Sequence, residues 1–183
     1  RAKAVIFLFM DGGPSQMDSF DPKPRLRAEH GRKLPFAPPT TVFNISDRIF
    51  GSPFEFRKYG QSGTEVSDLF PHTAQCVDKL CIIRSMVADH SEHTAANYFI
   101  HSGSGFQGRP SMGAWITYGL GSESTDMPGF IVMQSGPRGP RNGPLIWGSG
   151  FLPSSMQGVP LLGGPEPIFN LKPMDGVTDS RQR

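Results

Sequence analysis

Residues 88–103 hold three of the five histidines in the chain, together with an aspartate and a glutamate. A helix that begins at Ser91, a residue type favoured at the N-cap, places His93, Asn97 and His101 at intervals of four on one side. Imidazole rings gathered in this way act in proteins as metal ligands, nucleophiles or general acids. The spacing therefore marks this segment as the first candidate site.

The start of this helix also favours an anion. Its free backbone N–H groups and the positive end of its dipole suit phosphate or sulfate. A solvated, histidine-rich flank would have the same pattern, and the spacing does not match a closed structural zinc site. We expect the helix to end at Gly103. Its buried face should be apolar and consist of Ala95, Ala96, Phe99 and Ile100.

Asp11 is the second candidate. It follows the apolar run of residues 4–10 and precedes Gly12 and Gly13. An apolar run without alternation is typical of a strand buried on both faces of a parallel sheet, and ligands collect beyond the carboxyl ends of such strands. A carboxylate there suits a divalent cation, and the two glycines allow the backbone to approach a ligand closely. Asp11 suits a cap of the Gly-Pro turn equally well, so the residues alone leave both roles open.

The elements that would position these residues follow from hydrophobic periodicity. Apolar residues at three- and four-residue steps predict an amphipathic helix from residue 65. The resulting order of strand, helix, strand, helix and strand predicts an α/β fold, a mostly parallel sheet sandwiched by helices. The predicted strands cover residues 4–10, 80–83 and 129–133, with a short one at 40–45, and the predicted helices cover 65–80, 91–103 and 111–120.

Composition excludes several classes of protein. Lys and Arg total 18 against 16 Asp and Glu, a balance that does not favour nucleic acid or an anionic membrane as partner. No apolar run approaches the ~18 residues of a membrane span. The two cysteines, Cys76 and Cys81, are expected to be reduced, since they cannot form a disulfide scaffold.

The ends of the chain and one long segment bear on its organisation. Residues 135–176 are rich in Gly and Pro and are expected to form an ordered, functional loop. The chain opens with Arg1, and residues 178–183 look like the beginning of a helix. We therefore expect residues 1–183 to be a single α/β domain, the truncated N-terminal half of a longer protein whose targeting segment is not visible.

Residues 5–24, with the sequence VIFLFMDGGPSQMDSFDPKP, resemble the opening of a large sulfatase-like family of uncharacterised proteins, domain of unknown function 1501. Residues 80–86, 110–115 and 151–160 are similar to its later blocks. The resemblance implies membership of the alkaline phosphatase and sulfatase superfamily, whose α/β/α hydrolases use one or two divalent metals and a covalent nucleophile. It also implies export to the periplasm or the cell exterior. The metal, whether Zn, Ca, Mg or Mn, is left open.

The resemblance assigns roles position by position. Asp11 matches the first metal-ligating aspartate, while Gly12 stands where sulfatases have a second one. Counting back from the Ser-Gly that resembles the end of the nucleophile block places His93 at the modified cysteine and Asn97 at the arginine of that block. The motif Cys-x-Pro-Ser-Arg is absent, so formylglycine chemistry is not expected.

Several roles stay open at this point. Ser91 and Thr94 flank the nucleophile position and carry hydroxyls, whereas His93 is a metal ligand, a nucleophile or a general acid. The other ligands of the superfamily are an Asp-His pair and a further histidine from the second half of the fold. No histidine follows Gly103, so these residues alone are expected to show little or no turnover.

The leading hypothesis is a metal-dependent phosphate or sulfate ester hydrolase, with Asp11 and His93 meeting around one metal-bound oxyanion. Its substrate would be a small-molecule or polysaccharide ester. The alternative is a non-catalytic, sulfatase-like binding protein that takes a polysaccharide or protein through its long loops. A tight divalent site would favour the enzyme.

Overall fold

The computed structural model describes residues 2–38, 46–135, 139–163, 167 and 168. The chain divides into two compact units, Arg1–Val87 and Ala88–Arg183, which are described separately below. The prediction that residues 1–183 form a single α/β domain stays a prediction. The strand predicted over residues 40–45 and the helix predicted from residue 178 lie outside the described residues.

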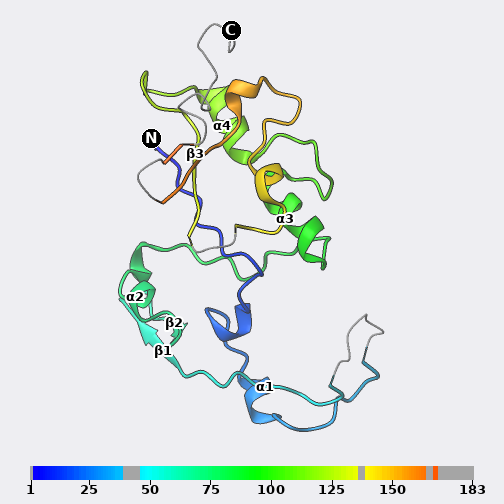
Figure 1. Cartoon of the computed structure of the whole chain (residues 1–183). Coiled ribbons are helices and arrows are strands. Elements are labelled where there is room, and N and C mark those ends of the chain that lie inside the picture. The colour runs from blue at the N-terminus through cyan, green and yellow to red at the C-terminus, as the bar shows by residue number, and fades with distance from the viewer. Residues whose placement is uncertain (1, 39–45, 136–138, 164–166, 169–183) are drawn as a thin grey trace, which may run out of the picture. The chain divides into compact units, whose positions relative to one another are not determined.

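The unit Arg1–Val87 contains one small antiparallel sheet (Figure 1). Strand β1 pairs with β2 in a hairpin whose register sets Phe56 opposite Ser67 and Tyr59 opposite Thr64. The backbone N–H of Ser67 also donates to the carbonyl oxygen of Ser19, which ties β2 to the chain after the first short helix. The elements of this unit are η1 (Gln16–Asp18), α1 (Pro24–Ala28), β1 (Phe56–Tyr59), β2 (Thr64–Ser67), α2 (Pro71–Ala74) and η2 (Val77–Lys79).

The core of this unit is small and lies under the hairpin. Val66 is fully buried and packs with Ala74 and Val77 from the two short helices that follow. Four partly buried side chains close this cluster: Phe20, Tyr59, Phe70 and Ile82. Because Ile82 belongs to the segment after η2, apolar packing holds that segment against the hairpin.

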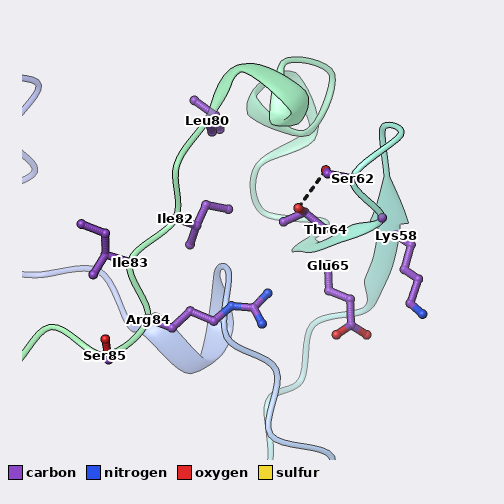
Figure 2. Close-up of a pocket in the computed structure, with 10 residues that line it drawn as sticks. Lys58, Ser62, Thr64, Glu65, Leu80, Ile82, Ile83, Arg84 and Ser85 are labelled. Carbon is purple, nitrogen blue, oxygen red and sulfur yellow. Dashed lines mark hydrogen bonds between the residues drawn. The ribbon is translucent and has the colours of Figure 1, made fainter.

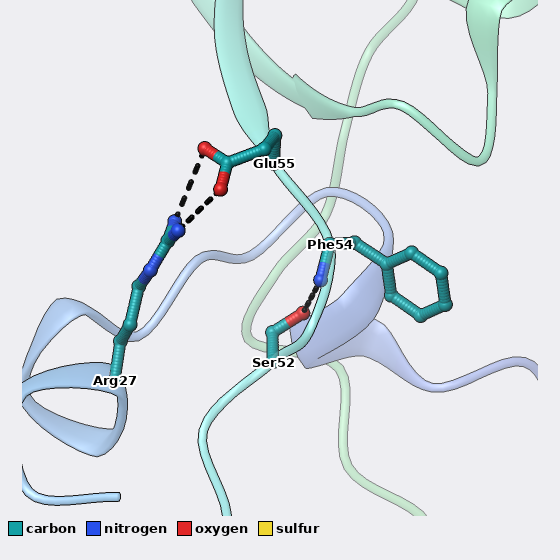
Figure 3. Close-up of polar contacts among 4 residues, drawn as sticks. All are labelled: Arg27, Ser52, Phe54 and Glu55. Atoms are coloured by element: carbon teal, nitrogen blue, oxygen red, sulfur yellow. Dashed lines mark hydrogen bonds and ion pairs between the residues drawn. The ribbon is translucent and has the colours of Figure 1, made fainter.

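A bidentate ion pair joins α1 to the chain that enters β1. Both terminal nitrogens of Arg27 contact the Glu55 carboxylate, and the Ser52 hydroxyl accepts the backbone N–H of Phe54 at 3.3 Å just before it (Figure 3). The hydrogen bond from Arg27 lowers the pKa of Glu55. Because both side chains are exposed, we expect this ion pair to contribute little to the free energy of unfolding. Its main effect is to position α1 next to the chain that enters β1.

The unit Ala88–Arg183 is built on two helices and a parallel strand pair (Figure 1). Strand β3 runs parallel to β4, with Ile131 opposite Val159 and Met133 opposite Leu161. In the contacts within this unit, α3 lies against η3 and α4 against η4. The elements are α3 (His93–Ser102), α4 (Met112–Leu120), β3 (Ile131–Met133), η3 (Gly143–Ile146), η4 (Ser154–Met156) and β4 (Val159–Leu161).

Two local signals for helices, the end of α3 and the start of α4, are confirmed. Helix α3 ends at Gly103, which adopts a left-handed conformation, and α4 begins after Ser111, whose hydroxyl accepts the N–H of Ala114 at 3.3 Å. The strand predicted at 129–133 is confirmed in part: β3 covers Ile131–Met133, and Ile131 and Met133 are exposed rather than buried. The coarse fold class, a mixture of α and β, is confirmed as well.

The sheet itself differs from the prediction. Among the described residues the structure has one antiparallel pair and one parallel pair of strands, not a mostly parallel sheet sandwiched by helices. Residues 4–10 form no strand, and side chains such as Ile6 and Leu8 are exposed. Residues 80–83 form no strand either. The reason is that an apolar run becomes a strand only where a neighbour takes its backbone hydrogen bonds, and no described segment pairs with these two runs.

The predicted helix over residues 65–80 is wrong in its first half. Residues 64–67 are strand β2, because they pair with Phe56–Tyr59 across a tight turn, and only the short α2 and η2 follow. The Gly- and Pro-rich segment 135–176 contains η3, η4 and β4 among its described residues. Cys76 and Cys81 are both free, as expected. In the part of the chain that is described, no helix is long and apolar enough to cross a membrane.

Candidate functional site

The start of α3 is capped by Glu92 and not by Ser91, which corrects the predicted N-cap. One oxygen of the Glu92 carboxylate accepts the backbone N–H groups of Thr94 and Ala95 at 2.8 and 3.1 Å. The other accepts the hydroxyl of Thr94 at 3.1 Å. The sequence favoured Ser91 because serine is a common N-cap, but the longer glutamate side chain one residue on reaches both amides. The helix start thus already holds an anionic group.

The electrostatics of this start agree with its geometry. The N–H groups of Thr94 and Ala95 lower the pKa of Glu92, and His93 lowers it further through its charge. His93 is the first residue of α3 and is exposed, as are Ser91 and Thr94. The predicted site residues at the helix start are therefore open to solvent and lie beside a carboxylate that stays ionised.

The polar side predicted for α3 is only partly correct. Asn97 is 5% exposed, whereas Ile100, predicted to be buried, is 52% exposed. His101 contacts the main-chain oxygen of Asn97 through Nδ1 at 2.8 Å, so its ring lies along the helix. His93 and Asn97 are one turn apart but lie in different surroundings, exposed and buried. Asn97 thus belongs to the packed face of the helix.

Asn142 is a residue that the sequence analysis missed. Its Nδ2 donates to the carbonyl oxygen of Thr94 at 2.8 Å, and its side chain is buried. This bond ties the Gly- and Pro-rich segment to the first turn of α3. The only local signal is an asparagine that precedes Gly-Pro, which marks a turn but not its partner.

Asp11 lies in a turn. The sequence had left open whether it caps this turn or binds a metal ion. Gly12 and Gly13 have φ angles of 90° and 71°, values that favour glycine, and a Cβ on either would meet nothing within 4 Å. Among the described residues, the backbone is therefore open on this side, and the approach of a ligand to Gly12 and Gly13 stays a prediction. Asp11 belongs to the unit Arg1–Val87 and His93 to the other unit, so their meeting around one metal stays a prediction.

The donors in the described part of each unit do not make up a complete metal site. Among the described residues, no group of three or more His, Cys, Asp or Glu side chains is placed to hold a metal ion. At the α3 start, His93 and Glu92 are two donors, and the Glu92 carboxylate is occupied by backbone amides. Catalytic zinc sites have three protein ligands.

The family described as "Protein of unknown function (DUF1501)" matches residues 2–183. No curated protein matches the chain. No solved structure matches it either.

Proposed function

The chain belongs to the DUF1501 family, and we propose that it is part of a phosphate or sulfate ester hydrolase whose oxyanion binds at the start of α3. The proposal includes the finer fold prediction, an alkaline-phosphatase-like α/β/α fold of the alkaline phosphatase and sulfatase superfamily. It also includes export to the periplasm or the cell exterior. Its support is the resemblance of residues 5–24 to the sulfatase-like family and the geometry of one helix start.

One observation carries the proposal: two adjacent N–H groups converge on an anionic oxygen. Thr94 and Ala95 both donate to Oε2 of Glu92. A phosphoryl or sulfuryl oxygen has the same charge character and accepts the same two bonds. When the Glu92 side chain rotates away, the amides and the Thr94 hydroxyl are available to an ester oxyanion at this position. Glu92 then acts as an internal competitor of the substrate.

The choice of base follows from the charges at this site. Glu92 accepts the Thr94 hydroxyl at 3.1 Å and is geometrically able to take its proton. Its pKa is lowered, however, so it is a weak base at neutral pH. Exposed His93 is the better candidate for proton transfer, with the hydroxyl of Thr94 or Ser91 as nucleophile. Asn97, buried in the helix face, is assigned a positioning role.

The metal is the second part of the proposal. A divalent ion, Zn, Ca, Mg or Mn, is proposed to bind the Asp11 carboxylate at its open turn. The expectation that His93 is a second metal ligand stays an alternative to its role in proton transfer. Such an ion, when bound, supplies charge stabilisation of the ester oxygens. The proposed substrate is a small-molecule or polysaccharide ester.

A non-catalytic binding protein is the second candidate, and exposed aromatic side chains favour it. Trp115 lies edge-to-face against Tyr118 and Phe151, at 6.1 and 5.8 Å between ring centroids. All three are exposed. Aromatic faces of this kind serve recognition of proteins and other partners. A polysaccharide or a protein would lie across this cluster.

Amide NMR with inorganic phosphate and sulfate tests the oxyanion site directly. We expect the signals of Thr94 and Ala95 to shift, and the affinity to rise in Glu92→Gln, because the competing carboxylate is then neutral. The N–H of Ala114 at the α4 start, capped by Ser111, is a matched control that should not respond. Equal shifts at both helix starts, or none at Thr94, would contradict the proposal.

Hydrolysis and metal binding separate the two candidate functions. We expect His93→Ala and Thr94→Val to abolish any hydrolysis of aryl phosphate or aryl sulfate, and Asp11→Asn to weaken divalent-ion binding in calorimetry. A chain that binds polysaccharide, shows no hydrolysis and has no tight divalent site would instead be the binding protein.

A further inference from the structure

The unit Arg1–Val87 has a groove on the side of its hairpin, between β2 and residues 80–85 (Figure 2). Its volume is about 700 Å³, within the size range of small-molecule sites. The groove is open to solvent, and all the residues that line it belong to the unit Arg1–Val87. Its polar lining consists of Lys58, Ser62, Thr64, Glu65, Arg84 and Ser85.

Both walls of the groove are held in place. The Asp78 carboxylate accepts the N–H groups of Gln61 and Ser62, both at 2.9 Å, and so fastens the hairpin turn to η2. Leu80 follows η2 directly and donates its N–H to the carbonyl oxygen of Val77 at 3.0 Å. Ile82 packs on the core under the hairpin. These contacts anchor Leu80 and Ile82 relative to β2, and Arg84 follows two residues after this anchored segment.

Three charged side chains line the groove. Within the described residues, Lys58, Glu65 and Arg84 form no ion pair within 4.0 Å. Lys58 lies opposite Glu65 in the hairpin register, so these two opposite charges are neighbours on one face. Arg84 extends from the other wall toward the hairpin (Figure 2). Two cations and one carboxylate give the lining a net positive charge. Since Lys58 lies opposite Glu65, the Arg84 guanidinium is the group left to bind an anion.

We propose that this groove binds an organic oxyanion, a phosphate or carboxylate group carried on an apolar body, with Arg84 as the counter-ion. A guanidinium offers two parallel N–H donors that match the two oxygens of such a group. The Ser85 hydroxyl, which also lines the groove, supplies a further donor. The Thr64 hydroxyl shares a hydrogen bond of 3.0 Å with the Ser62 hydroxyl in the same lining (Figure 2). Leu80 and Ile82 provide apolar surface for the body of the ligand. This site is independent of the ester hydrolase proposed above.

Binding of phenyl phosphate and of benzoate to the full chain, with benzyl alcohol as uncharged analogue, tests the site and distinguishes the two oxyanions. We expect one of the anions to shift the amide signals of residues 62–65 and 82–85. Its affinity should fall about tenfold in Arg84→Gln, because a charge-assisted bidentate bond is lost. In Glu65→Gln the affinity should rise, since a repelling carboxylate is removed.

Arg57→Gln is the matched control. Arg57 adjoins Lys58 on β1, so its side chain points to the opposite face of the hairpin and does not line the groove. Arg57→Gln removes one positive charge from the unit Arg1–Val87, as Arg84→Gln does. The proposal is overturned if Arg57→Gln weakens binding as much as Arg84→Gln does. It is also overturned if benzyl alcohol binds as tightly as the anions, or if neither anion shifts the groove signals. Unchanged amide spectra of the free variants confirm that they fold.

Discussion

Asn142 donates a hydrogen bond to the main-chain oxygen of Thr94 across 48 residues of sequence, at 2.8 Å. The acceptor lies in the same turn as the two N–H groups that hold the Glu92 carboxylate. A segment rich in Gly and Pro thus fixes the helix start on which the proposed oxyanion site depends. Ile146, which is buried, belongs to η3, the element that lies against α3, and Trp147 directly after it is buried as well.

Asn142→Ala should therefore destabilise this unit by about 1 kcal/mol, because a buried hydrogen bond is lost without replacement. Urea denaturation measures the change, and hydrogen exchange at residues 94–97 locates it. Gln157→Ala removes an exposed amide side chain from the same segment and should be neutral within about 0.5 kcal/mol. If both variants lose the same stability, the bond to Thr94 is not what fixes the helix start.

The helices of the unit Ala88–Arg183 were predictable because their signals are local. Ser111 and Gly121 bound α4 at the positions that cap preferences indicate, and Gly103 ends α3. The predicted N-cap of α3, Ser91, is one residue before the observed one, Glu92. Glutamate is not among the preferred N-cap residues, so the sequence pointed to serine. That the Glu92 carboxylate reaches two backbone amides becomes visible only in the folded structure.

Strands were harder to predict because pairing is non-local. Val66, Phe70, Ala74 and Val77 recur at three- and four-residue steps, which suits a helix, and all four contribute to the core under the hairpin. Only the pairing of residues 64–67 with 56–59 decides that Val66 belongs to a strand. The bond between Asn142 and Thr94 escaped prediction for the same reason, since no periodicity links residues so far apart.

The Glu92 cap predicts a pH dependence of the α3 start. The N–H groups of Thr94 and Ala95 lower its pKa below the unfolded value. The stabilisation is therefore present above the unfolded pKa and is lost as the pH falls through the lower, folded pKa. The amide signals of Thr94 and Ala95, followed from neutral to acidic pH, should titrate with that lowered value. In Glu92→Gln the titration should disappear; its persistence would assign the cap to another group.

Asp78 predicts a second acid transition, in the other unit. Its carboxylate accepts the N–H groups of Ser62 and Gln61, which lower its pKa. Because this pKa is lowered on folding, as for Glu92, the ionised Asp78 stabilises the hairpin turn fully at a pH above the unfolded pKa. This stabilisation is lost as the pH falls through the folded pKa. Asp78→Asn should speed hydrogen exchange at residues 61 and 62 at neutral pH and make it less sensitive to acid. Asp68→Asn changes an exposed aspartate of the same unit; it is the control and should change neither.

Two glycines of the unit Ala88–Arg183 predict opposite effects of the same substitution. Gly150 has a φ of 57°, and a Cβ there would lie 2.6 Å from the carbonyl carbon of Arg109. Gly150→Ala forces backbone apart and strains a left-handed residue, so it should destabilise the unit by about 1–3 kcal/mol. Gly119 lies in α4 with nothing within 4 Å of its Cβ, so Gly119→Ala should stabilise it by about 0.5–1 kcal/mol. Urea denaturation decides the signs. A neutral Gly150→Ala would mean that the chain around Pro110 does not pack against Gly150 in solution.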